Sequence, residues 1–260
     1  MKCRALLLLV LGLLTVQAAE PGLLFHAGFD SYVVDADFAK GDKKGSGLPE
    51  KDLQLRMFPG PRNQGNSLAL GKLERVRYKA DKNIDPRKGT VSLWMAPVNW
   101  DFFGRDILTI FNFSDKARSI RLFKHSWGPY IIGQYQWRYP GDKKIYSRQV
   151  QMMINPKEWQ KGQWHHVAIS WDQDMMQLFI DGVLIPEPPR TGTPRFWENK
   201  PAPPDYPVSR KKFPEALPEL QKGGWIYLGD VFGIKKVSET LRTAIDEVKI
   251  YDRPLSANEM

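Results

Sequence analysis

The sequence predicts an all-β protein, a two-sheet antiparallel jelly-roll sandwich. Short runs of alternating apolar and polar residues, rich in β-branched and aromatic side chains, follow one another between turn residues. No long stretch has the 3.6-residue periodicity of an amphipathic helix. The dipeptide Asp181-Gly182 joins two of the alternating runs in the manner of a two-residue hairpin. Regular short strands with such turns favour a sandwich over a parallel α/β sheet.

Residues 1–19 predict a cleaved signal peptide. Lys2 and Arg4 precede an apolar run over residues 5–16, and Ala18 and Ala19 supply the small residues of a cleavage site. The run is shorter than the roughly 20 apolar residues of a spanning helix, and a membrane anchor is the alternative. We therefore expect a secreted or extracytoplasmic protein, in the periplasm or at the cell surface.

The remaining residues, 20–260, predict one domain without covalent cross-links. Cys3 is the single cysteine and leaves with the signal peptide, so the mature chain has neither a disulfide nor a cysteine metal site. The formal charge of +9 becomes +7 without Lys2 and Arg4. A basic surface attracts acidic glycans, but the charges are too scattered to form the dense basic stripe that nucleic acids require.

Six runs and one meander are predicted as strands. The six runs lie at residues 24–29, 67–70, 90–96, 107–113, 119–123 and 130–135. The meander covers residues 164–185, and its first strand places Val167 and Ile169 on one face. We expect the tryptophans of these strands to be core residues, namely Trp94, Trp164 and Trp171.

A proline-rich insertion breaks the strand pattern at residues 186–222, which hold ten of the twenty prolines. Proline cannot donate a hydrogen bond to a sheet, so this segment is not a core strand. Its aromatic residues favour an ordered flap folded over the sandwich. A mobile insertion without a role is the alternative, because loops of this length are either functional or disordered.

Four segments resemble, in order, the motifs of the laminin-G-like jelly rolls within the concanavalin A-like lectin/glucanase fold. They are Gly89-Thr-Val-Ser-Leu-Trp94, Gly162-Gln-Trp-His-His-Val-Ala168, Leu178-Phe-Ile-Asp-Gly182 and Ala244-Ile-Asp-Glu-Val-Lys-Ile-Tyr-Asp252. The resemblance implies two curved antiparallel sheets packed face to face over residues 20–260. It also implies a recognition module without catalytic activity, because many members of this family are of that kind.

The sequence lacks the carboxylate pattern of glucanases on this fold. These enzymes need two carboxylates on one strand, spaced as Glu-x-Asp-x-x-Glu, to flank the scissile bond. Asp246 and Glu247 are adjacent, so we expect them on opposite faces of a strand. His165 and His166 diverge for the same reason and cannot share a metal. We therefore expect no enzyme, and a divergent glycan hydrolase or lyase is the remaining alternative.

Calcium is the ion that we expect. The resemblance implies that Asp30, at the end of the first strand, meets Asp246 of the last motif, where some relatives hold a structural calcium. The turn at Gly65-Asn66 would add a carbonyl oxygen, a ligand that calcium accepts beside carboxylates. The alternative is that Asp246 caps a turn or pairs with an arginine.

Loop aromatics provide the signal for sugar binding, because flat rings suit the apolar faces of pyranoses and neighbouring cations hold hydroxyls or carboxylates. The candidate carbohydrate-binding residues are Trp100, Phe103, Trp127, Trp137, Arg138 and Tyr139. The predicted function is a secreted, non-catalytic carbohydrate-binding module, with an acidic polysaccharide as ligand. The alternative is an adhesion or assembly module that contacts a protein partner through residues 186–222.

Overall fold

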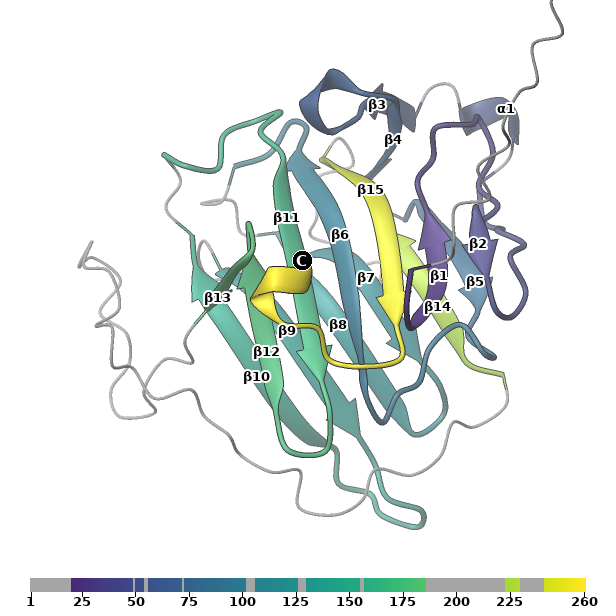
Figure 1. Cartoon of the computed structure of the whole chain (residues 1–260), viewed down its shortest axis with the longest axis vertical. Helices are drawn as coiled ribbons and strands as arrows, with labels where there is room; N and C mark the ends of the chain where they lie inside the picture. The colour runs from purple at the N-terminus through teal and green to yellow at the C-terminus, as the bar shows by residue number, and fades with distance from the viewer. Residues whose placement is uncertain are drawn as a thin grey trace, which may run out of the picture.

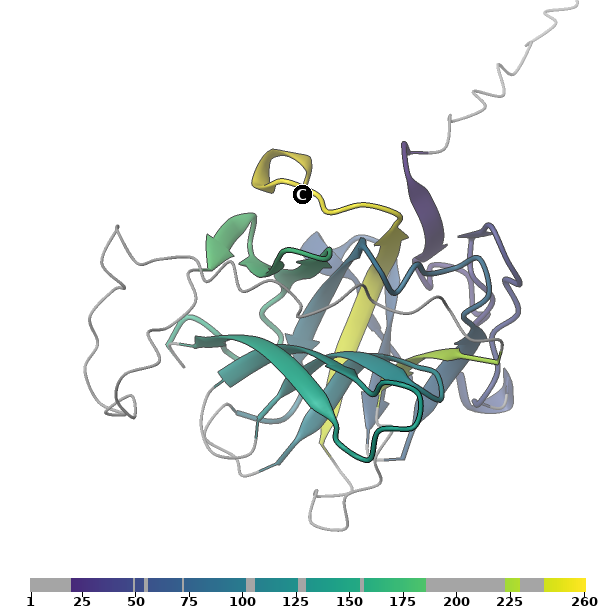
Figure 2. The same cartoon turned by 90° about the horizontal axis from the view of Figure 1, so that it is seen from below.

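A computed structural model describes residues 20–48, 50–53, 56–71, 73–101, 106–125, 130–154, 157–185, 223–229 and 241–260. These residues form two antiparallel sheets stacked face to face (Figures 1 and 2), which confirms the predicted all-β sandwich. The predicted signal peptide, residues 1–19, and the proline-rich segment, residues 186–222, lie outside the described residues.

Sheet A contains nine of the described strands. Its main order is β13 (Val183–Ile185), β12 (Met176–Ile180), β11 (His165–Trp171), β6 (Gly89–Pro97), β15 (Arg242–Tyr251), β1 (Leu23–Ala27) and β2 (Phe38–Ala39). The first half of β15 also pairs with β4 (Asn66–Gly71), which in turn pairs with β3 (Met57–Pro59). The first and the last strand of the domain therefore lie side by side, as the family resemblance implies.

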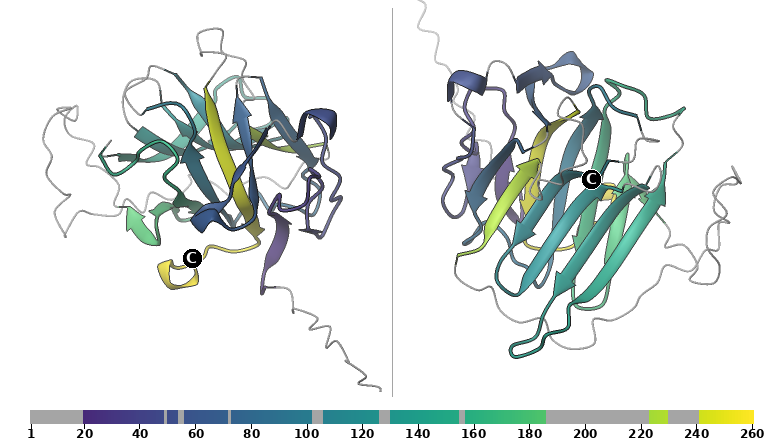
Figure 3. Two further views of the ribbon diagram at one scale, coloured as in Figure 1. Left: turned by 90° about the horizontal axis from the view of Figure 1, so that it is seen from above. Right: turned by 180° about the vertical axis from the view of Figure 1, so that it is seen from behind.

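Sheet B contains six of the described strands and faces the viewer in the right-hand view of Figure 3. Its order is β10 (Tyr146–Met153), β9 (Tyr130–Trp137), β8 (Arg118–Lys124), β7 (Leu108–Ser114), β14 (Trp225–Gly229) and β5 (Arg75–Lys79). The described helices are short: α1 (Glu50–Leu53) and the 3₁₀ turns η2 (Pro61–Asn63) and η3 (Ala257–Glu259). Among the described residues, no helix has the length and apolar character needed to cross a bilayer.

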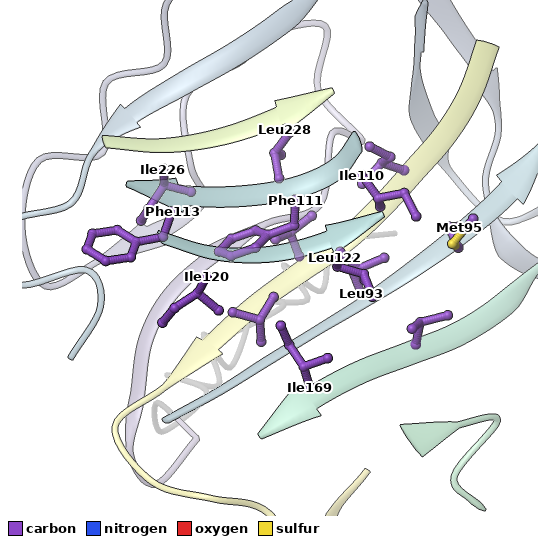
Figure 4. Packing of buried hydrophobic residues seen from close by; sticks show 14 of the residues in the cluster. Leu93, Met95, Ile110, Phe111, Phe113, Ile120, Leu122, Ile169, Ile226 and Leu228 are labelled. Carbon is purple, nitrogen blue, oxygen red and sulfur yellow. The ribbon is translucent and has the colours of Figure 1, made fainter. Parts of the chain in front are cut away.

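The core lies between the sheets, where most inward-facing residues of the long strands are buried. Leu93 and Ile169 of sheet A face Phe111, Ile120 and Leu122 of sheet B (Figure 4), and all five side chains are fully buried. Because strand side chains alternate between faces, this inner set fixes which residues of the same strands point outward. The geometry of the outer faces therefore follows from the core.

The predicted meander is confirmed. Strands β11 and β12 pair in register from Val167↔Ile180 to Trp171↔Met176. Asp181 and Gly182 have φ angles of 50° and 77°, the two positive values that a type I′ hairpin turn requires. His165 and His166 diverge as predicted.

Two of the three tryptophans predicted for the core lie elsewhere, and this prediction was wrong for them. Trp171 is fully buried between the sheets, but Trp94 and Trp164 are half-buried on the outer face of sheet A. Leu93 points inward, so Trp94 must point outward, where its ring lies 5.4 Å from that of His166. Trp164 packs against Phe58 of β3 on the same outer face.

The substitution Leu122→Ala tests the core. Leu122 is fully buried at the centre of sheet B, so the cavity left behind should lower the free energy of unfolding by about 2–5 kcal/mol. Urea unfolding followed by circular dichroism measures the change. The matched control is Val183→Ala, at a position that is 62% exposed, which should change stability by less than about 0.5 kcal/mol. Equal effects of the two substitutions would contradict this core.

Candidate functional site

The structure places two of the predicted sugar-binding tryptophans in the interior. Trp100 is 3% exposed and its Nε1 donates a hydrogen bond of 3.1 Å to Thr243 Oγ1. Trp137 is 4% exposed and belongs to the main core. Neither ring can stack on a sugar without leaving the core, so both are corrected to structural residues. Phe103 and Trp127 lie outside the described residues.

The other two predicted residues follow Trp137 in the hairpin between β9 and β10. Tyr146 lies in a stacked arrangement with Trp137, with ring centroids 5.8 Å apart, and meets Tyr139 edge-on at 5.3 Å. The rings of this hairpin therefore pack against one another. Arg138 is exposed on the same hairpin. The structure thus brings Trp137, Arg138 and Tyr139 together, as a packed hairpin end and not as an open aromatic platform.

A row of polar and aromatic side chains crosses the outer face of sheet B. Cross-strand pairing aligns one residue from each described strand in the order Arg77 (β5), Tyr227 (β14), Asn112 (β7), Arg121 (β8), Gln134 (β9) and Gln149 (β10). Their neighbours along each strand point into the core, so all six side chains share the outer face. We call this set the outer row.

Hydrogen bonds between side chains hold half of the outer row in place. Arg121 Nη2 donates to Gln134 Oε1 and, at 3.0 Å, to Gln136 Oε1. Gln134 Nε2 donates to Gln149 Oε1 at 3.3 Å, and Gln149 Nε2 donates to Gln151 Oε1 at 2.8 Å. The oxygen of each glutamine is thus an acceptor within the network. N–H donors outnumber acceptors in this network, because an arginine side chain has five N–H groups and each glutamine amide has two.

Asn112 occupies the centre of the outer row and has an unused acceptor. The residue is 1% exposed, and its Oδ1 has no hydrogen-bond donor within the described part of the chain. Tyr227 and Arg121 flank it as cross-strand neighbours on the same face. A buried acceptor without a donor costs about 1–3 kcal/mol, and at 1% exposure Asn112 is covered by its neighbours on this face.

The outer face of sheet B is positively charged. Arg75, Arg77 and Lys79 alternate along β5 and are exposed, and Arg121 adds a fourth cation on β8. No Asp or Glu of the described strands of sheet B points to this face. Lys79 pairs with Asp42 of a neighbouring loop at 3.0 Å. The face therefore has an excess of positive charge.

Aromatic rings accompany these cations. The guanidinium group of Arg77 lies 4.8 Å from the centroid of the Trp225 ring, and that of Arg121 lies 5.3 Å from the Phe123 ring. Such cation–π contacts orient the guanidinium groups. Arg121 is half-buried, and this burial lowers the pKa of its guanidinium group. A desolvated cation interacts more strongly with an anion than an exposed one does.

Sequence reasoning missed this surface for an identifiable reason. It searched loops for aromatic residues, whereas the outer row consists of single polar residues spread over six strands. The signal was present in segments such as Arg75-Val-Arg-Tyr-Lys79, whose burial alternates with period two. Only the strand order and register show that these residues lie side by side.

A separate cavity of about 300 Å³ lies on the outer face of sheet A. Its lining includes Asp30, Trp94, Asp246 and Glu247. Asp246 and Glu247 were expected on opposite faces, and this prediction was wrong. The pairing of β15 with β6 shifts register between Asp246 and Lys249, and Glu247 has a φ of 48°. This β-bulge turns both carboxylates to the same face.

The two carboxylates of the bulge have opposite pKa shifts. Burial raises the pKa of Asp246 to about 8, assisted by the charges of Glu247 and Asp30. The hydrogen bond from His26, 3.0 Å from Glu247, lowers the pKa of Glu247. Asp246 Oδ1 accepts a hydrogen bond of 2.8 Å from the backbone N–H of Glu247, so the predicted turn-capping role of Asp246 is observed in part.

The loop from Gly60 to Gly65, with Arg62, lies beside Asp30 and Asp246 in this cavity. The loop from Gly60 to Gly65 runs so close that a Cβ on Gly65 would lie 1.8 Å from Asp30 Oδ1, and one on Gly60 would lie 3.2 Å from Asp246 Oδ2. Both predicted calcium ligands thus border the same loop. Among the described residues, no three acidic, histidine or cysteine side chains converge as a metal cluster. A calcium ion held here would therefore need backbone carbonyl oxygens as well.

Comparison with known proteins identifies the family. The family model of the concanavalin A-like lectin/glucanases superfamily matches residues 71–203, just over half of the chain. No curated protein sequence matches the chain.

Solved structures share the fold at low sequence identity. One is the botulinum neurotoxin serotype D ligand binding domain in complex with N-acetylneuraminic acid, with a TM-score of 0.61 and 11% identity over 92% of this chain and 49% of that one. The present chain thus spans about half the length of that toxin domain. Another is domain 4 of AbnA, a GH43 extracellular arabinanase from Geobacillus stearothermophilus, in complex with arabinotriose. Its TM-score is 0.55, with 18% identity over 91% of this chain and 95% of that one.

The stacked antiparallel sheets, the pairing of the first strand with the last and the family match agree with one another. The chain belongs to the concanavalin A-like lectin/glucanases superfamily.

Proposed function

We propose that this protein is a non-catalytic carbohydrate-binding module that acts outside the cell and binds an acidic polysaccharide on the outer face of sheet B. The outer row carries the proposal. With its neighbours on the same face it combines four cations, three aromatic rings and a glutamine network, and the described strands of sheet B contain no Asp or Glu. Two proteins of the same fold support it, since their structures contain a sialic acid and an arabinotriose.

The chemistry of the outer row favours an acidic ligand over a neutral one. Each glutamine oxygen of the network accepts a hydrogen bond from a neighbour, so the amides offer N–H groups outward. Arg121 and Arg77 offer only donors. A ligand rich in acceptors and negative charge satisfies such a surface, and hydrogen bonds between ionised groups are roughly twice as strong as neutral ones.

The substitution Arg121→Gln tests this function. It removes the central charge and retains a side chain that can donate hydrogen bonds. Binding to polygalacturonate, measured by isothermal titration calorimetry, should weaken by about tenfold or more. The wild-type affinity should also fall with added salt, because the Debye length shortens from ~10 Å at 0.1 M to ~3 Å at 1 M.

The control variant is Arg138→Gln, which removes an exposed cation from the hairpin that the sequence predicts as part of the site. It should bind with the wild-type affinity. Loss of binding in Arg138→Gln with retention in Arg121→Gln would move the site to the hairpin. Absence of binding to any glycan by the wild-type protein would reject the function.

We also propose that Asp30 and Asp246 hold a structural calcium ion together with carbonyl oxygens of the Gly60–Gly65 loop. Asp246 is 3% exposed, and no described Lys or Arg forms an ion pair with it. Its Oδ1 accepts a hydrogen bond from the backbone N–H of Glu247, but a buried carboxylate without a cationic partner is costly, and a divalent cation would lower that cost. Bound calcium would join the loop to β15 and to the end of β1.

Calcium binding and protonation of Asp246 should compete. Because the pKa of Asp246 is raised from 3.8 to about 8, the folded state binds more protons than the unfolded state between these values. In the presence of chelator, stability should therefore fall as the pH rises through this window. The fall should be smaller in Asp246→Asn. Calcium should raise the melting temperature of the wild-type protein, more at pH 8 than at pH 6, and leave that of Asp246→Asn unchanged. An equal calcium response in both proteins would reject the site.

A further inference from the structure

We propose that a second cavity on sheet A, of about 320 Å³, binds a single neutral sugar ring. It lies on the outer face of the sheet, between β6, β11, β15 and the C-terminal turn η3 (Figures 1 and 2), and we call it the C-terminal pocket. Trp94 and Glu247 also border the cavity at Asp246. The proposal goes beyond the acidic-polysaccharide site and does not depend on it, because the two sites lie on opposite faces of the sandwich.

The C-terminal pocket is preformed and has the size of one sugar ring. Thr90 Oγ1 accepts a hydrogen bond of 2.9 Å from the backbone N–H of Leu255 and donates one of 2.9 Å to the carbonyl oxygen of Arg253. These bonds fix the segment that covers the pocket to β6. Because ligand pockets in proteins begin at about 300 Å³, this cavity suits one ring and not a stretch of polysaccharide.

A buried pair of polar side chains forms the floor of the pocket. Ser92 and His166 are 7% and 8% exposed, and Ser92 Oγ lies 2.7 Å from His166 Nε2. Burial lowers the pKa of His166, so its ring is neutral at pH 7. The second ring nitrogen, Nδ1, has no hydrogen-bond partner within the described part of the chain. A neutral imidazole has one donor and one acceptor nitrogen, which suits a hydroxyl group because a hydroxyl also donates and accepts.

Trp94 supplies an aromatic ring at the edge of the pocket. It points outward from β6 and is half-buried. Its ring centroid lies 5.4 Å from that of His166 at a tilt of 56°, and no other described ring contacts it. The ring is therefore not stacked on another ring, unlike those of the β9–β10 hairpin. Aromatic rings of this kind pack on the apolar faces of sugars.

The charged groups on the walls of the pocket are already paired. Lys249 Nζ lies 2.6 Å from Glu20 Oε1 and 4.0 Å from Glu247 Oε2, and Arg253 Nη1 lies 2.7 Å from Glu259 Oε1. A charged ligand would have to compete with these ion pairs. A neutral ligand need not, because each carboxylate keeps acceptor sites and the ammonium group has three N–H donors. The pocket therefore favours hydroxyl groups over ions, in contrast to the cationic face of sheet B.

A panel of single sugars tests the proposal. The isotopically labelled protein is titrated by NMR with the methyl glycosides of glucose, galactose, mannose and arabinose, and with glucuronate and glucosamine as charged comparators. At least one neutral sugar should shift the side-chain signals of Trp94 and His166, with a Kd of about 1 mM or below. The charged comparators should bind about tenfold more weakly than that sugar, because they compete with the ion pairs of the walls.

Variants of two tryptophans on the same face locate the sugar. Trp94→Ala should weaken binding of the neutral sugar by about tenfold or more, and Trp94→Phe, which keeps an aromatic ring, should fall between this variant and the wild type. The matched control is Trp164→Ala. Trp164 is also half-buried on the outer face of sheet A but borders neither cavity, so this variant should keep the wild-type affinity. Circular dichroism checks that all three variants fold.

Four results would overturn the proposal. If no neutral sugar at about 10 mM shifts Trp94 or His166, the pocket is rejected, and binding of polygalacturonate still decides the function proposed for sheet B. Shifts confined to Arg121 and Gln134 would place the sugar on sheet B instead. Equal losses of affinity in Trp94→Ala and Trp164→Ala would show a general effect on the sheet. Tighter binding of glucuronate or glucosamine than of every neutral sugar would contradict a neutral ligand.

Discussion

The two-residue period of the strands, imposed by a close-packed core, is the constraint on which the rest of the structure depends. Ile120 and Leu122 are fully buried between the sheets, so Arg121 between them must point outward. The same reasoning places Tyr227 outward between Ile226 and Leu228. Because antiparallel pairing then aligns the strands, residues far apart in the sequence form one continuous row. A register slip of one residue would exchange the core and the outer row.

The two outer faces of the sandwich differ in charge. Sheet B presents cations and amide donors, which suit an acidic glycan. The cavity on sheet A is bordered by Asp30, Asp246 and Glu247, which suit a cation. The second arrangement depends on the bulge in β15, because a regular strand would turn Glu247 into the core. A carboxyl with a pKa of about 8 beside one with a lowered pKa also resembles the acid and base of a catalytic pair. The calcium ion proposed between Asp30 and Asp246 would account for the same geometry without catalysis.

Much of the fold could be predicted from the sequence, whereas the site could not. The strand from His165 to Trp171 and the turn at Asp181-Gly182 follow from local rules of alternation and backbone conformation. The face of a strand is harder to assign where nearly every residue is buried, as in β6 and β11, because alternation then does not separate the inner face from the outer one. Trp94 and Trp164 were predicted as core residues for this reason. The position of Glu247 depends on a bulge that no local pattern signals. The outer row depends on strand order, so its six residues carry no signal when each is considered alone.

The most direct test of the central claim is an NMR titration of the isotopically labelled protein with an oligogalacturonate hexasaccharide. The account predicts that shifts concentrate on β5, β14, β8, β9 and β10, and that the side-chain amides of Gln134 and Gln149 move together with the backbone of Arg121. Resonances around Trp94 and Asp246 should respond to calcium and not to the sugar. Shifts confined to the cavity on sheet A, or to the hairpin that carries Arg138 and Tyr139, would contradict the account.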